Sequence, residues 1–74
     1  MAFHPEVLEV RRGDTVIWIN RDIVPHTATA KRKGGWNTGP MPQGVSGHYV
    51  ANHRGEDSYF CELHPTMLGK LIVR

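Results

Sequence analysis

Three side chains with metal-binding chemistry lie within residues 61–67, CELHPTM. Cys61 is the only cysteine of the chain; His64 follows it three positions later, and Met67 three positions after that. A thiolate and a thioether are soft donors and an imidazole is intermediate, so this set suits copper far better than magnesium or calcium. Pro65 stiffens the turn by fixing its own φ angle. The spacing indicates that a loop wrapped around one centre can direct all three donors at a copper ion.

A trigonal copper site needs a second imidazole. The candidates are His4, His26, His48 and His53. His26 is favoured because it follows Pro25 just after the segment TVIWIN, in a connection that can return to the end of the molecule where Cys61 lies. The other three lie near the N-terminus or flank a predicted hairpin elsewhere on the sheet.

The rest of the chain has the pattern of an all-β protein. Short β-branched and aromatic segments alternate with turn residues, and no long window keeps a helical period. This pattern favours an antiparallel sandwich or barrel. Cys61 ends one predicted strand and Gly69 opens the last, so the segment between them is expected to be a connecting loop. The predicted strands are residues 5–10, 15–20, 26–32, 45–51, 57–61 and 69–74.

Length and charge restrict the possible functions. Seventy-four residues make one small domain, 1–74, whose core alone gives limited stability, and a bound metal is one common supplement. A net charge of +2 is too small to indicate nucleic-acid binding, and the basic run 31–33 is expected to be a solvated loop. One cysteine cannot form an internal disulfide, no stretch is long enough for a membrane span, and no secretion leader follows Met1.

Several segments together resemble the cupredoxins, the small blue copper proteins, and among them the amicyanin and plastocyanin branch. VRRGDTVIWIN is similar to that family's V-x-x-G-D-T-V-x-W-x-N strand pair, and VPHTA to the loop with its first histidine ligand. GPMPQG is similar to the stretch before the next strand, and YFCELHPTMLGKLIV to the ligand loop and last strand. The Cys-x-x-His-x-x-Met spacing is the short, amicyanin-like form. The resemblance covers nearly the whole chain.

The resemblance implies a Greek-key β-sandwich, one type 1 copper, and single-electron transfer rather than enzymatic catalysis, usually outside the cytoplasm, as in the periplasm. The implied ligands are His26, Cys61, His64 and Met67, and the residues next to them are Pro25, Thr27 and Pro65. The ring edge of His64 is expected in an apolar patch that docks a redox partner transiently. The expected patch residues are Pro25, Pro40, Met41, Pro42, Leu63 and Leu68.

The chain departs from the family at three places. Thr27 replaces the usual asparagine that ties the two ligand loops together, and a hydroxyl has a shorter reach, so the tie is expected to be looser or different. Asp57 replaces an aromatic residue four positions before the cysteine, which removes a core or corner aromatic. The family's usual first strand has no counterpart here. An exposed sheet edge invites pairing, so we expect a tendency to form a homodimer.

Other functions remain open. The same ligands suit a copper carrier or buffer, or the copper-sensing module of a larger periplasmic protein. An enzyme that uses Cys61 as nucleophile and His64 as base is disfavoured. No oxyanion-hole loop or orienting residue is identified, and Met67 would have no role. Zinc accepts the same donors. Met41 is the second candidate for the axial ligand.

Overall fold

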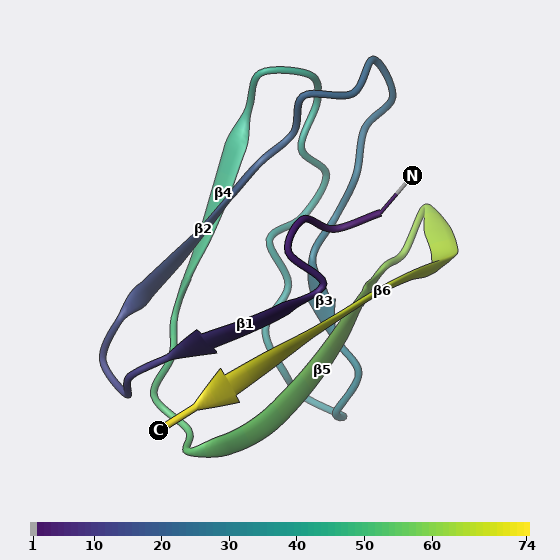
Figure 1. Ribbon diagram of the computed structural model, residues 1–74. Helices are drawn as coiled ribbons and strands as arrows, with labels where there is room; N and C mark the ends of the chain where they lie inside the picture. Colours follow the sequence, from purple (N-terminus) through teal and green to yellow (C-terminus); the bar gives the residue numbers. More distant parts are fainter. Residues whose placement is uncertain (1) are drawn as a thin grey trace.

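The strands of the protein form two sheets in the computed structural model, which describes residues 2–74 (Figure 1). One sheet has the order β1-β6-β5-β3 and the other pairs β2 with β4. Each connection from β1 through to β5 crosses from one sheet to the other, and only β5 and β6 follow each other within a sheet. The predicted all-β sandwich is thereby confirmed. The strands are β1 (Val7–Val10), β2 (Thr15–Ile19), β3 (Thr29–Ala30), β4 (Ser46–Val50), β5 (Gly55–Cys61) and β6 (His64–Val73).

Strand β2 shows how the sequence pattern sets the two faces of a sheet. Side chains alternate along a strand, and Val16 and Asn20 are buried whereas Ile17 and Ile19 are 63% and 57% exposed. Antiparallel pairing with β4 places Ile17 opposite His48, outside the core. Only β4 pairs with β2 within residues 2–74, so one edge of β2 has no strand beside it.

The core between the sheets is centred on Tyr59, which is 2% exposed. Its ring packs edge-to-face with those of Phe3 and Trp18, with centroid distances of 4.7 Å and 5.4 Å. The same ring lies directly on the backbone of Gly69, because a Cβ there would be 2.3 Å from Tyr59 Cζ. Gly69 is therefore required for the close approach of β5 and β6 next to the ligand segment.

All six predicted strands are present, four with bounds that differ from the prediction by one or two residues at an end, and two with bounds that differ more. β3 is only Thr29–Ala30, much shorter than predicted. β6 begins at His64, five residues before the predicted start, because Cys61 pairs with His64 across a turn of two residues, with a register shift between Phe60 and Cys61. The prediction of a loop between Cys61 and Gly69 was therefore wrong, because this segment is the end of a tight β5–β6 hairpin.

Asp57 is buried, although its position was expected to cost the core an aromatic side chain. Trp36 supplies that aromatic from the connection between β3 and β4, stacking on Trp18 and Tyr49 with centroid distances of 5.2 Å and 4.5 Å. Its indole Nε1–H donates to Asp57 Oδ2 at 2.9 Å, and the guanidinium of Arg32 lies 3.3 Å from the other carboxylate oxygen. The carboxylate is therefore fully partnered inside the sandwich.

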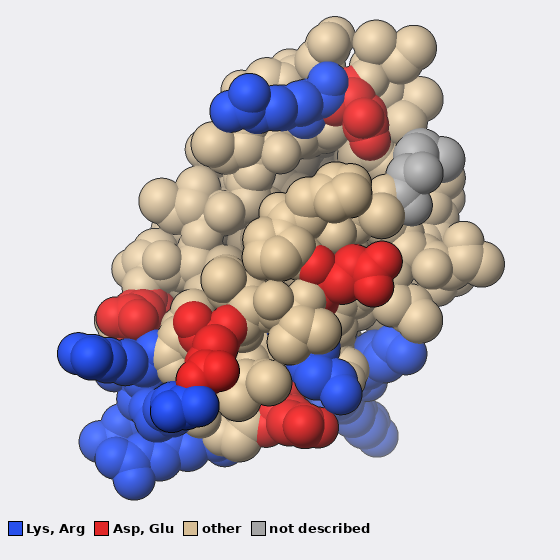
Figure 2. All heavy atoms as spheres, in the orientation of Figure 1, with Lys and Arg blue, Asp and Glu red and all other residues tan. Residues whose placement is uncertain are grey.

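The charged residues are unevenly distributed over the surface. Figure 2 shows most Lys and Arg side chains on this face at the end where β1 and β6 finish, while the opposite end shows a basic and an acidic side chain together among uncharged residues. The basic residues Lys31, Arg32 and Lys33 are exposed, as predicted. No helix in the described part of the chain is suited to crossing a lipid bilayer.

Candidate metal centre

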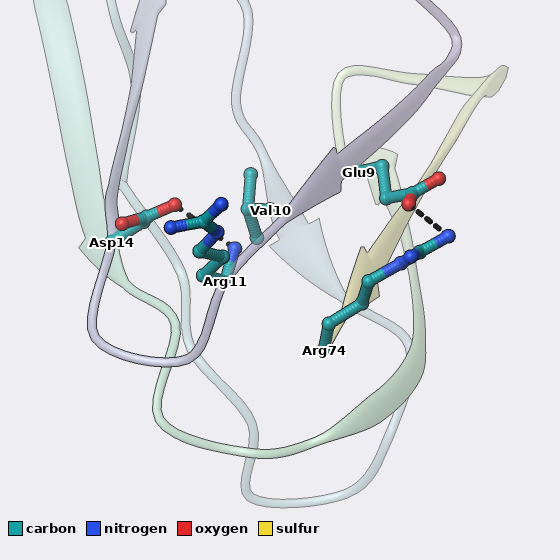
Figure 3. A pocket seen from close by; sticks show the side chains of 5 residues that line it. All are labelled: Glu9, Val10, Arg11, Asp14 and Arg74. Carbon is teal, nitrogen blue, oxygen red and sulfur yellow. Dashed lines mark hydrogen bonds and ion pairs between the residues drawn. The ribbon is translucent and has the colours of Figure 1, made fainter.

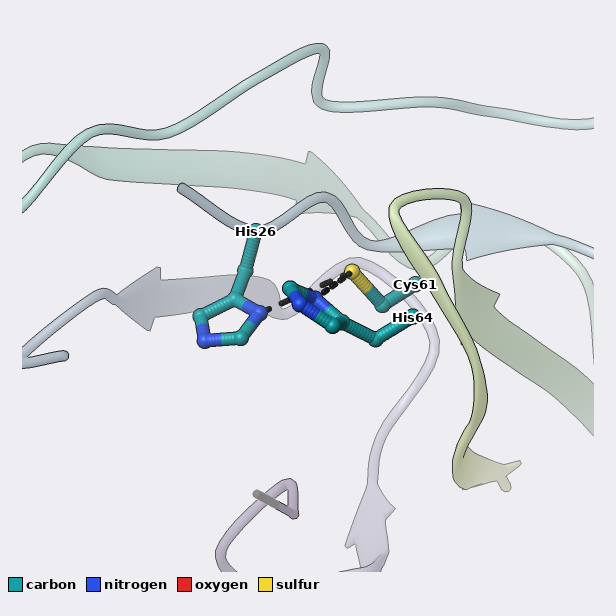
Figure 4. Close-up of side chains that lie close together, drawn as sticks. All are labelled: His26, Cys61 and His64. Atoms are coloured by element: carbon teal, nitrogen blue, oxygen red, sulfur yellow. Dashed lines mark hydrogen bonds between the residues drawn. The ribbon is translucent and has the colours of Figure 1, made fainter. Parts of the chain in front are cut away.

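Three predicted ligands meet at the end of the sandwich where β5 turns into β6. His26 Nδ1 lies 3.6 Å from Cys61 Sγ, and His64 Nδ1 lies 3.8 Å from the same sulfur. One ligand atom from each of the three residues lies within 4.8 Å of the others. Figure 4 shows both imidazole rings directed at the sulfur from different segments of the chain.

The dimensions of this donor triangle fit a metal ion. A four-coordinate zinc ion has metal–sulfur distances of about 2.3 Å and metal–nitrogen distances of about 2.0–2.1 Å, and bond angles between tetrahedral and trigonal then separate S from N by about 3.6–3.8 Å. The two observed sulfur–nitrogen separations are 3.6 Å and 3.8 Å. One thiolate and two imidazoles in this arrangement match the trigonal donor set of a blue copper site.

The hairpin and one neighbouring connection hold the donors in place. Cys61 ends β5 and is completely buried, and His64 opens β6 and is half-buried. His26 lies on the connection between β2 and β3, where its backbone forms an isolated bridge with Met41. Met41 N–H donates to His26 O at 2.7 Å, and His26 N–H donates to Met41 O at 3.2 Å. These backbone bonds anchor the second imidazole independently of the hairpin.

Thr27 ties the two ligand segments together through both its backbone and its side chain. Its backbone N–H donates to Cys61 Sγ at 3.3 Å. Its hydroxyl accepts the Glu62 N–H at 2.9 Å and pairs with the Thr29 hydroxyl at 3.0 Å. Thr27 was expected to connect the two ligand segments either more loosely or in a different way. The structure shows a different connection, a direct hydrogen bond between the Thr27 hydroxyl and the backbone N–H of Glu62.

The electrostatic surroundings favour the thiolate form of Cys61. Burial alone would raise the pKa of the thiol, but hydrogen bonds from Thr27 N–H, both imidazoles and the Leu63 backbone lower it to about 6. Burial would likewise lower the pKa of His26, yet hydrogen bonds with Cys61 and Asp22 and their negative charges raise it. The protein thus prepares the anionic sulfur that a metal ligand requires.

Met67, the predicted axial ligand, is buried on β6 and borders a cavity of about 380 Å³ together with His26 and Met41. The alternative ligand Met41 points toward β4, because a Cβ on Gly47 would be 2.8 Å from its Sδ. This contact favours Met67 over Met41, and the assignment of Met67 as ligand stays a prediction.

The expected docking patch is exposed except for one residue. Met41 is only 3% exposed, because its side chain packs on Gly47, and its expected place in the patch was wrong. Ile23, which the sequence did not single out, is 85% exposed on the connection that carries His26. The remaining expected residues are exposed: Pro25, Pro40, Pro42, Leu63 and Leu68, and Pro65 is exposed as well.

A second hollow, of about 480 Å³, lies near the other end of β6. Figure 3 shows it lined by an ion pair of Arg74 with Glu9 and by the turn in which the Arg11 N–H donates to Asp14. It contains no metal-type donor set. Of the other histidines, His48 lies exposed on β4, and His4 and His53 are exposed outside the donor triangle.

Two residues of the centre were missed by sequence reasoning. Asp22 Oδ2 lies 2.7 Å from His26 Nε2. Asn20 was given no role at the site, but its side-chain amide donates to Val24 O and Met41 O and its Oδ1 accepts the Asp22 N–H. The only sequence signal for the contact between Asp22 and His26 was their spacing of four residues. That spacing indicates a contact only when the fold of the β2–β3 connection is known.

The chain is similar to curated amicyanins and to a plastocyanin over most of its length. The chain is 33% identical over 73 residues to amicyanin from Paracoccus versutus, covering 93% of this chain and 54% of the relative. It is 35% identical to amicyanin from Paracoccus denitrificans, over 99% of this chain and 59% of the relative. A plastocyanin from a Synechococcus strain is 30% identical, over 99% of this chain and 64% of the relative. No protein-family model matches the chain.

Solved structures show the same fold. The oxidised state of an amicyanin mutant superposes with a TM-score of 0.94 and 29% identity, over the whole of this chain and 74% of that structure. A purple cupredoxin from Nitrosopumilus maritimus gives a TM-score of 0.91 and 30% identity, over 96% of this chain and 80% of the other. The chain therefore belongs to the cupredoxin family and has the amicyanin/plastocyanin type of fold. It spans little more than half the length of the first two curated relatives, 54% and 59%.

Proposed function

We propose that residues 1–74 form one domain that binds a single type 1 copper and carries single electrons between redox proteins. The observation that carries this proposal is the donor triangle of His26, Cys61 and His64, whose sulfur–nitrogen edges of 3.6 Å and 3.8 Å fit one metal ion. Met67 is the proposed axial donor. Copper, when bound, supplies a one-electron couple between Cu(I) and Cu(II).

The residues of the protein keep the centre nearly unchanged between the two oxidation states. The β5–β6 hairpin fixes Cys61 and His64, and the bond from Glu62 N–H to Thr27 fixes that hairpin against the connection bearing His26. A thiolate and two imidazoles already arranged as a triangle need little rearrangement when charge changes. A rigid donor set is what fast electron transfer requires, and it is not needed for storing copper.

The proposed electron exit is His64, because its ring is half-buried while His26 is 4% exposed. Leu63 in the hairpin turn and Leu68 on β6 are each 48% exposed, and both are close in sequence to His64. These exposed apolar side chains suit brief apolar docking with a redox partner. We place this activity outside the cytoplasm, where the resemblance to the family puts it.

Copper addition tests this function. One equivalent of Cu(II) is expected to give an intense blue band and narrow copper hyperfine splitting in the EPR spectrum, because the Cys61 thiolate donates charge to copper. Cys61→Ser is expected to lose the band. A pale, ordinary copper spectrum that survives Cys61→Ser would refute the proposal.

The alternative role as copper carrier is tested on the same protein. Burial of Cys61 and His26 supports retention of the metal, so we expect reversible reduction cycles without copper loss in the presence of a chelator. Ready transfer of copper to the chelator would favour carriage. Zinc in a recombinant preparation would not decide between them, since zinc accepts the same donors.

The axial assignment is tested by Met67→Leu. This variant is expected to keep copper and to raise the reduction potential, because losing a weak donor disfavours Cu(II). A lowered potential would count against Met67 and return Met41 as the candidate. Voltammetry of both proteins makes the measurement.

We also propose that the chain forms a homodimer through the free edge of β2. That strand has a hydrogen-bonded neighbour on one side only within residues 2–74, and Ile17 and Ile19 are exposed on it. Unpaired strand edges invite pairing with another strand. Sedimentation at high micromolar concentration is expected to show a dimer that Ile17→Lys weakens. A monomer under those conditions refutes this proposal.

A further inference from the structure

One charged side chain outside the donor triangle makes a direct hydrogen bond to a proposed ligand. Asp22 Oδ2 lies 2.7 Å from Nε2 of His26, on the side of the ring opposite the atom that faces Cys61. We propose that Asp22 is a positioning residue that fixes the ring and tautomer of His26 for metal binding and adds negative charge to that ligand. This inference rests on the proposed copper-binding function and names a residue that tunes it.

The tautomer follows from the chemistry of the two partners. An ionised carboxylate only accepts hydrogen bonds, so the His26 nitrogen that meets Asp22 must carry the proton. In the neutral ring the other nitrogen, Nδ1, then carries a lone pair on the side where Cys61 Sγ lies 3.6 Å away, and only the protonated ring donates to both Asp22 and the thiolate. A metal-bound histidine ordinarily donates its remaining N–H to a carboxylate, a carbonyl or water, and such partners raise the basicity of the ligand.

The carboxylate is held in place before any metal arrives. Asn20 is 5% exposed, and its side chain makes three hydrogen bonds to backbone groups. Its Oδ1 accepts the Asp22 N–H at 2.8 Å, and its amide group donates to Val24 O at 2.8 Å and to Met41 O at 2.7 Å. Because Met41 is also bridged to His26, one buried side chain holds both Asp22 and the ligand it contacts.

The two proposed imidazole ligands therefore differ. Within the described residues His64 has a hydrogen-bond contact only with Cys61, whereas His26 has a carboxylate behind it. The Asp22 side chain is 51% exposed, so one end of this pair is in contact with solvent while His26 is buried. Its negative charge favours the more positive copper state, Cu(II), over Cu(I). Removing that charge should raise the reduction potential and weaken Cu(II) binding.

The chain offers a matched control for general charge effects. Glu62 is also an exposed carboxylate next to a proposed ligand, but its side chain accepts from Asn37 Nδ2 at 2.9 Å rather than from an imidazole. Glu62→Gln therefore removes one negative charge near the centre without touching a ligand ring. Asp22→Asn removes the charge and keeps an acceptor, and Asp22→Ala removes both.

The first measurement is made on metal-free protein carrying Cys61→Ser, which removes the thiolate that competes with Asp22 for the one proton of a neutral ring, by ¹⁵N NMR of the His26 imidazole at a pH where the ring is neutral. In this background the parent and Glu62→Gln are expected to show the Nε2–H tautomer, Asp22→Asn largely the same, and Asp22→Ala a mixture of tautomers. A pure Nε2–H tautomer in Asp22→Ala would overturn the positioning role. This readout does not depend on copper, so it stays informative even if the proposed function fails.

The second measurement is made on the copper protein. Loss of an outer hydrogen-bond partner typically costs about 10–100-fold in metal affinity, and we expect Cu(II) affinity to fall within that range in Asp22→Ala. The reduction potential is expected to rise in both Asp22 variants. Glu62→Gln is expected to change both quantities much less. Equal changes in Asp22→Asn and Glu62→Gln would show a general charge effect and would refute the specific role of Asp22.

Discussion

Replacing Thr27 by valine isolates the side-chain bond between the two ligand segments. Valine keeps the branched shape at a site that is 2% exposed, and it removes the hydroxyl that accepts the Glu62 N–H at 2.9 Å. That amide would then lack its partner in a partly buried position, which costs about 1–3 kcal/mol. Because Glu62 itself is exposed, water can replace part of the lost bond, and we expect the low end, about 1–2 kcal/mol.

The assay is urea unfolding of the metal-free protein, with hydrogen exchange at the Glu62 amide as a local probe. In a domain of this size each kcal/mol lowers the unfolding temperature by about 4–8 °C. Thr29→Val is the matched control. It removes the other hydroxyl of the pair, which bonds to the Thr27 hydroxyl and not to the hairpin. Thr27→Ser should retain amide protection while losing about 0.8 kcal/mol for the missing methyl group.

The exchange data decide the interpretation. Thr27→Val is expected to lose Glu62 protection, and Thr29→Val and Thr27→Ser are expected to keep it. Unchanged protection in Thr27→Val, or a stability loss no larger than that of Thr29→Val, would refute the claim that this hydroxyl ties the ligand segments together.

Three further predictions test other parts of the structure. The thiolate absorbance of the metal-free protein should titrate with a midpoint of about pH 6, the pKa of Cys61. A thiol pKa that is lower in the folded protein than in the unfolded one adds stability at pH values above the unfolded pKa. The difference in free energy of unfolding between wild type and Cys61→Ser should therefore shrink from pH 9 to pH 6. A titration midpoint near pH 9 would contradict this prediction. Gly69→Ala places a Cβ 2.3 Å from Tyr59 Cζ and should cost about 1–3 kcal/mol in urea unfolding; a cost that persists in a Tyr59→Leu background would refute the clash. Arg32→Met should cost more than Asp57→Leu in the same assay, because it leaves the Asp57 carboxylate, whose side chain is 8% exposed, buried without its cation, whereas Asp57→Leu leaves an arginine side chain that is 43% exposed to water; a larger cost for Asp57→Leu would contradict the burial argument.

Much of the fold could be predicted from local patterns. Alternating burial in β2 and the buried pair Tyr59 and Cys61 on β5 follow directly from side-chain alternation along a strand. The start of β6 could not be predicted, because Pro65 and the donor spacing resemble a loop locally. Pairing between Cys61 and His64 extends the strand, and that pairing exists only when the hairpin forms.

The sequence by itself determined the donor chemistry and its spacing. A single thiol, an imidazole three residues later and a second histidine after a strand are properties of the chain, and they predict a copper-type set without coordinates. Only the tertiary structure decided which groups support those donors. Thr27 meets Glu62 across 35 residues, and Trp36 reaches Asp57 across 21, because strands from different parts of the chain pack together. Such contacts depend on distance in space, which residue types and local periodicity do not contain.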